Sequence, residues 1–148
     1  MEAANKGAYD AGGASVGLNI RLPLEQSNNK FVTDSMSFDH FYVRKVMLAF
    51  ASEVYVFFPG GFGTLDEFSE ILTLVQTHKI KKVPLVLYGR EYWTPIVELF
   101  RTHFFEKYHA IDKGDLDLFF LADTVDEAYA YIMENVVCKD TTYGMNTV

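Results

Sequence analysis

A short apolar run, a cluster of glycines and a helical pattern follow one another between residues 54 and 75. Residues 54–58 are β-branched or aromatic, which predicts a buried strand. Residues 65–75 carry apolar side chains at helical spacing, and residues 59–63 between the two include three glycines. A strand that turns through glycines into a helix leaves backbone N–H groups at the positive end of the helix dipole. The sequence therefore predicts a site for a phosphate group at this turn.

The rest of the chain alternates between helical and strand patterns, which predicts an α/β fold with a parallel sheet covered on both faces. Helices are predicted over residues 1–11, 38–52, 92–108 and 124–136, and strands over residues 15–20 and 83–88. Residues 116–121 are compatible with either a short strand or a packed turn. Residues 21–37 are polar and predict a loop long enough to suspect a function. In sheets of this class, ligands bind at the carboxyl ends of the strands, where the glycine turn is expected.

Composition limits the classes of function. The length of 148 residues predicts one domain over residues 1–137, followed by a polar tail over residues 138–148. A formal net charge of -7 argues against nucleic-acid binding, although it allows a small anionic ligand. The single cysteine, Cys138, excludes an internal disulfide. We expect a cytoplasmic protein, because we find neither an apolar run of about 18 residues nor a signal peptide.

The histidines and aromatic residues suggest no further site. His40, His78, His103 and His109 lack metal-ligand spacing, so we expect no metal site. Trp93 lies in an aromatic-rich helical pattern, and we interpret it as a core or dimer-surface residue rather than a base-stacking platform.

Thr64 and Glu67 have two interpretations. Thr-x-x-Glu is the spacing of a capping box, in which the two side chains only satisfy the first amides of a helix. The same spacing recurs at Thr124 and Glu127 without glycines, and there we predict capping alone. At Thr64 and Glu67 the preceding glycines favour a role in a site. Glu70, one turn beyond Glu67, is either a ligand for a ribose hydroxyl or a solvated or interface residue.

Residues 59–67 read P-G-G-F-G-T-L-D-E and match the pattern P-G-G-x-G-T-x-x-E, with Arg44-Lys45 upstream of them. This combination resembles the LOG (LONELY GUY) proteins, long labelled as possible lysine decarboxylases. Residues 22–26, Asn29 and residues 73–77 fit the longer bacterial branch of that family. The resemblance is strong over residues 1–89 and looser beyond.

The resemblance implies a Rossmann-like fold, a homodimer with sites near the subunit interface, and no cofactor. It also implies a phosphoribohydrolase that cleaves the N-glycosidic bond of AMP or of cytokinin riboside 5′-monophosphates. By matched position, Arg44 and Glu67 would be the catalytic pair. The residues that would contact the nucleotide are Glu25, Lys45, Gly60, Gly61, Gly63, Thr64 and Thr73. The competing interpretations are a solvated helix face for Arg44-Lys45 and an ordinary loop position for Glu25.

One departure from the family concerns the start of the chain. Family members have a strand and a glycine-containing turn before the helix that opens here at residue 1, so we expect the first portion of the fold to be missing. Two other functions remain open. The first is a non-catalytic carrier of a nucleotide or cofactor, similar to molybdenum-cofactor carrier proteins. The second is the decarboxylase of the older label, which would need pyridoxal phosphate on a lysine, and no lysine here has a recognisable context for it.

Overall fold

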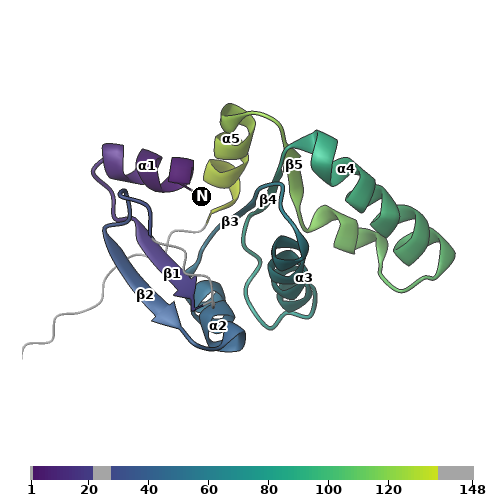
Figure 1. Ribbon diagram of the computed structural model, residues 1–148. Helices are drawn as coiled ribbons and strands as arrows, with labels where there is room; N and C mark the ends of the chain where they lie inside the picture. Colours follow the sequence, from purple (N-terminus) through teal and green to yellow (C-terminus); the bar gives the residue numbers. More distant parts are fainter. Residues whose placement is uncertain (1, 22–27, 137–148) are drawn as a thin grey trace, which may run out of the picture. The chain divides into compact units, whose positions relative to one another are not determined.

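The computed structural model describes residues 2–21 and 28–136, and the chain divides into two compact units, Met1–Ala51 and Ser52–Val148 (Figure 1). The first unit contains α1 (Glu2–Asp10), β1 (Val16–Ile20), β2 (Asp34–Phe38) and α2 (Phe41–Ala51). The second contains three strands and the remaining helices. The single domain predicted over residues 1–137 stays a prediction beside this division.

Helix α1 ends at the two glycines, as the sequence predicts. The amide of Gly12 donates to the carbonyl of Tyr9 at 3.0 Å, and the amide of Gly13 donates to the carbonyl of Ala8 at 2.8 Å. These bonds satisfy carbonyl groups of the last helical turn.

Strand β2 corrects the prediction of an unbroken loop over residues 21–37. It pairs in parallel with β1 along its whole length, from Val16 opposite Asp34 to Ile20 opposite Phe38. Its sequence, DSMSF, gave no strand signal because four of its five side chains are exposed, Met36 among them. The strand depends on backbone hydrogen bonds to a distant segment, which a local pattern cannot reveal. The helix predicted from residue 38 accordingly starts at Phe41.

The second unit is built on a three-stranded parallel sheet, in the order β3 (Tyr55–Phe57), β4 (Leu85–Tyr88) and β5 (Phe120–Ala122). The strands predicted around residues 54–58 and 83–88 are confirmed. The ambiguous stretch at residues 116–121 resolves into the end of a 3₁₀ helix, η2 (Lys113–Asp117), and the start of β5. All strand pairs in the described residues are parallel, and they belong to two sheets.

Helices cover both faces of this sheet. On one face, Phe68 of α3 (Phe62–Gln76) is fully buried, and its ring contacts those of Phe57, Phe119 and Trp93. Trp93 belongs to α4 (Arg90–Leu99), and its complete burial confirms a core role. The other face packs against α5 (Val125–Asn135), whose buried residue Ala128 lies in one cluster with strand residues. The layers are helix, sheet and helix, as the sequence predicts.

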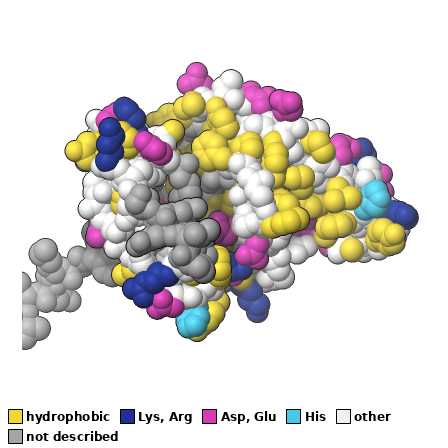
Figure 2. All heavy atoms as spheres, viewed as in Figure 1, with side chains coloured by type: hydrophobic (Ala, Val, Ile, Leu, Met, Phe, Trp, Pro, Cys, Tyr) yellow, Lys and Arg dark blue, Asp and Glu magenta, His cyan; other side chains and the backbone are white. Residues whose placement is uncertain are grey.

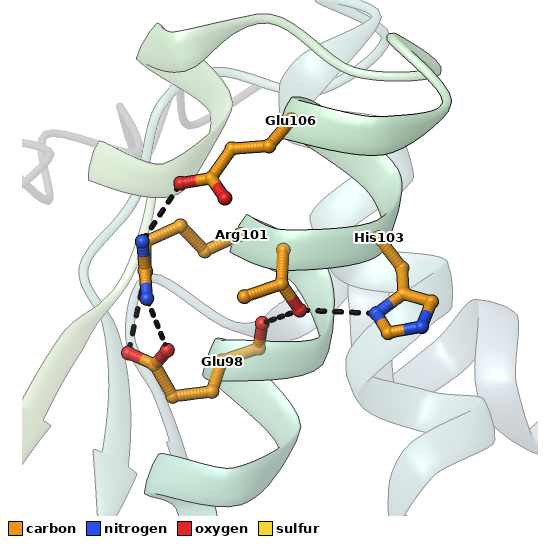
Figure 3. A network of polar contacts seen from close by, with 5 residues as sticks. Glu98, Arg101, His103 and Glu106 are labelled. Carbon is orange, nitrogen blue, oxygen red and sulfur yellow. Dashed lines mark hydrogen bonds and ion pairs between the residues drawn. The ribbon is translucent and has the colours of Figure 1, made fainter.

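The helix predicted over residues 92–108 continues from α4 into a π-helix, η1 (Phe100–Lys107). Figure 3 shows a polar network along this segment, in which Arg101 contacts Glu98 and, at 2.7 Å, Glu106. The hydroxyl of Thr102 donates to the carbonyl of Glu98 and lies 3.0 Å from the His103 ring. The ion pairs are exposed, so we expect them to add little to stability.

Candidate functional site

The glycine turn lies at the carboxyl end of β3, where the sequence predicts it. Strand β3 ends at Phe57 and helix α3 begins at Phe62, so the helix starts inside the glycine motif. Residues 58–63 are all exposed, and Phe62 itself is 93% exposed. A ligand can therefore reach the backbone of this turn from solvent.

Gly60 and Thr64 are packed against one another across the turn. A Cβ atom at position 60 would lie 2.9 Å from the Cβ of Thr64 and closer still to its hydroxyl oxygen, whereas a Cβ at Gly61 or Gly63 would meet nothing within 4 Å. Position 60 therefore needs glycine, because any Cβ there would come too close to Thr64. The Thr64 side chain leans back over the turn that precedes it, as expected near the start of a helix. The Gly60 backbone and the Thr64 hydroxyl therefore lie side by side.

The capping interpretation of Thr64 and Glu67 is wrong. The N-cap of α3 is Gly61, which has no side-chain cap hydrogen bond, and Thr64 is the third residue of the helix. At Thr124, by contrast, the hydroxyl accepts from the Glu127 amide at 3.2 Å and the capping box is complete. The prediction of capping alone at Thr124 is confirmed. The Thr64 amide donates to the Gly61 carbonyl at 3.1 Å. Because Gly61 has no capping side chain, a ligand can take the place of a cap at the start of α3.

Glu67 lies on the second turn of α3. It is five residues beyond Phe62, which corresponds to roughly 7 Å along the helix axis. Its side chain is half-buried, as is that of Glu70, and both have interactions with neighbouring groups. The fully buried Phe68 beside Glu67 fixes this part of the helix on the sheet. Glu67 is thus held on a rigid element beyond the glycine turn, and its catalytic role stays a prediction.

Tyr92 is also part of this edge of the sheet, although the sequence motifs did not predict it. Its hydroxyl donates to the carbonyl oxygen of Gly60 at 2.8 Å. Tyr92 lies on the first turn of α4, which follows β4 through Gly89, a residue in the left-handed region with φ of 97°. The available signal was a glycine directly after a parallel strand, because the carboxyl ends of neighbouring strands meet at one edge.

A charged cluster joins the ends of β4 and β5 at the same edge. The amide of Arg90 donates to a carboxylate oxygen of Asp123 at 2.7 Å, and its guanidinium lies 3.4 Å from Asp123 and 3.7 Å from Glu127. The backbone amide of Asp123 donates to Glu127 at 2.8 Å and is the main cause that lowers the pKa of the Glu127 carboxyl. These groups link the start of α4 to the start of α5.

Arg44 and Lys45 belong to the first unit, on α2. The Arg44 Nε donates to the carbonyl of Leu18 in β1 at 2.9 Å. Both side chains are half-buried and both have further interactions. Arg44 is therefore anchored to the backbone of its own unit, which argues against a freely solvated helix face.

Thr73 lies elsewhere on α3. It lies nine positions beyond Thr64, which corresponds to roughly 14 Å along the helix axis. Its hydroxyl donates to the carbonyl of Ser69 at 2.7 Å, and it lines a pocket of about 160 Å³ between α3, η1 and the residues before β5. Figure 2 shows hydrophobic side chains gathered over the α4–η1 end of this unit. The role of Thr73 as a nucleotide contact stays a prediction. Glu25, another predicted nucleotide contact, lies outside the described residues.

Within residues 2–21 and 28–136, no three His, Cys, Asp or Glu side chains gather as a metal site would require. In the same part of the chain, no helix has both the length and the apolar character needed to cross a membrane.

The parallel strands, the helices on both faces and the glycine turn at a strand's carboxyl end define a Rossmann-like α/β protein. A family model described as "Possible lysine decarboxylase" matches residues 1–132, and the chain belongs to this family, that of the LOG proteins. Comparison with curated proteins finds no match.

Proposed function

We propose that this protein is a nucleoside 5′-monophosphate phosphoribohydrolase, which hydrolyses AMP or a cytokinin riboside monophosphate to the free base and ribose 5-phosphate. The observation that supports it most is the open glycine turn before α3, with Glu67 on the next turn of the same helix. Family membership and the paired Arg44-Lys45 support it as well.

The turn supplies what a 5′-phosphate needs. The exposed N-terminus of α3 offers backbone amides and the positive end of a helix dipole. The Thr64 hydroxyl, packed over Gly60, adds one more donor at the same point. In this proposal the phosphate binds at residues 60–64, and the ribose extends along α3 towards Glu67.

In this proposal the Glu67 carboxylate acts on the sugar. Cleavage of an N-glycosidic bond passes through a transition state with oxocarbenium character, as in glycosidases. A carboxylate beside the anomeric carbon stabilises this positive charge or orients the attacking water. Arg44 holds the substrate through its guanidinium, and Lys45 adds positive charge. The leaving base takes up a proton as the carbon–nitrogen bond breaks, and water supplies the new hydroxyl.

The lysines that the structure describes do not fit the decarboxylation that the family description names. An amino-acid decarboxylase of the pyridoxal phosphate type carries its cofactor on a lysine within a shielded site. Among the described lysines, all except the half-buried Lys45 are exposed. Lys45 is adjacent to Arg44 in a pair that the hydrolase proposal already uses.

The test is to incubate the full chain with AMP and measure adenine and ribose 5-phosphate by chromatography. We expect both products in equal amounts, and a loss of at least a hundredfold in rate for Glu67→Gln, which keeps the size of the side chain but removes its charge. Glu134→Gln on α5, an exposed glutamate, is the matched control and should keep the wild-type rate.

Two outcomes would contradict the proposal. If the wild-type chain binds AMP without releasing adenine, it is a carrier rather than an enzyme. If Glu67→Gln releases adenine as fast as Glu134→Gln does, Glu67 has no catalytic role. We also propose a homodimer, from family membership, and light scattering of the full chain tests it.

A further inference from the structure

We propose that Tyr92 is a positioning residue for the phosphate-binding turn, and that its hydroxyl fixes the direction of the Gly60–Gly61 peptide group. This inference rests on the proposed function, because it assigns a role within the same site. The observation behind it is the hydrogen bond of 2.8 Å from the Tyr92 hydroxyl to the Gly60 carbonyl oxygen.

The carbonyl of Gly60 and the amide of Gly61 belong to one planar peptide group. In a trans peptide these two groups point in opposite directions, and the described residues contain no cis peptide bond. A hydroxyl that holds the carbonyl on the Tyr92 side therefore directs the Gly61 N–H to the opposite side. Gly61 is the N-cap of α3, so its N–H lies next to the amides that open the helix.

This peptide group needs an external restraint. Both of its residues are exposed glycines, which have the widest range of backbone conformations. Gly61 has no side chain that could cap the helix and so hold the turn in place. The amides of Thr64 and Leu65 hold the Gly61 carbonyl, which belongs to the next peptide group. Without a partner for the Gly60 carbonyl, the Gly60–Gly61 peptide plane is less restrained, and the direction of its N–H is less well defined. Accepting a hydrogen bond at the carbonyl also polarises the peptide, which makes its N–H a stronger donor.

Tyr92 is itself held firmly. Its backbone amide donates to the carbonyl of Gly89 at 3.2 Å, and its ring packs edge-to-face on the buried Trp93, with centroids 5.1 Å apart. A Cβ at Gly89 would lie 3.4 Å from Pro59, so the loops after β3 and β4 also approach closely beside this bond. The hydroxyl is thus presented by a rigid helix to an otherwise adjustable turn.

The test uses the two products of the proposed reaction as probes, because neither is consumed. Dissociation constants for ribose 5-phosphate and for adenine are measured by calorimetry on the full chain and on Tyr92→Phe. We expect the variant to bind ribose 5-phosphate about five- to tenfold more weakly, the range of one lost hydrogen bond, and to bind adenine as the wild type does. In turnover, KM for AMP should rise by a similar factor.

Tyr131→Phe is the matched control, since it removes a hydroxyl from another half-buried tyrosine, on α5. It should leave both dissociation constants unchanged. If Tyr92→Phe lowers the melting temperature but not the affinity for ribose 5-phosphate, the residue is only structural and the inference is wrong. If the wild-type chain fails to bind ribose 5-phosphate, the phosphate site itself is wrong and the inference falls with the proposed function.

Discussion

Gly60→Ala is the substitution for which the structure makes the sharpest prediction. The new methyl carbon would lie 2.9 Å from the Cβ of Thr64 and closer still to its hydroxyl oxygen, shorter than real Cβ contacts allow. Either the Thr64 side chain changes its rotamer or the turn shifts. Introducing an atom into a contact this tight costs about 1–3 kcal/mol. The free energy of unfolding should fall by that amount, and the melting temperature by about 2–4 °C per kcal/mol.

Gly63→Ala is the matched control. The same methyl group at position 63 would meet nothing within 4 Å, and position 63 lies inside helix α3. Because alanine favours helix more than glycine does, this variant should be as stable as the wild type or more stable by up to about 1 kcal/mol. Alanine is thus expected to lower the free energy of unfolding at Gly60 and to leave it unchanged or raise it at Gly63.

The assay is urea unfolding of the full chain, followed by circular dichroism. A third variant, Gly60→Ala with Thr64→Ala, removes the hydroxyl oxygen and methyl group nearest the clash, so it should recover part of the loss in a double-mutant cycle. Equal stability of Gly60→Ala and Gly63→Ala would refute the reasoning. So would a double variant in which the two losses simply add.

Three further predictions concern the second unit. Phe68→Ala should lower the free energy of unfolding in urea by about 3–5 kcal/mol, because this fully buried ring contacts both the sheet and α4. Phe104→Ala, at a position 42% exposed, is the control and should cost far less. Thr124→Ala should cost about 1 kcal/mol through loss of the α5 cap, and a loss below the error of the unfolding measurement would contradict the capping box. The folded state lowers the pKa of the Glu127 carboxyl, so ionised Glu127 stabilises the fold above the ordinary carboxyl pKa, and this effect is lost as the pH falls through the folded-state pKa. Glu127→Gln should therefore flatten the acid limb of a curve of unfolding free energy against pH. An unchanged acid limb would contradict this prediction.

The sequence by itself determined the elements that are marked by local periodicity. Apolar spacing located α3 and the buried face that holds Phe68, and a β-branched run located β3. The cluster of glycines between them was sufficient to place the turn at the carboxyl edge of a parallel sheet. Such features follow from the sequence because burial imposes a repeat of about 3.6 residues on a helix, while glycine alone tolerates close contact at a turn.

Only the tertiary structure decided the features that depend on distant partners. Strand β2 exists through its backbone ladder with β1, although its own side chains are polar and exposed. The N-cap of α3 lies at Gly61 rather than Thr64, because the glycines allow the helix to start inside the motif. The contact between Tyr92 and Gly60 joins residues 32 positions apart, and it arises because parallel strands bring their carboxyl ends to one edge. Hydrogen bonds of this kind leave no repeat in the chain, so they become visible only when the fold is known.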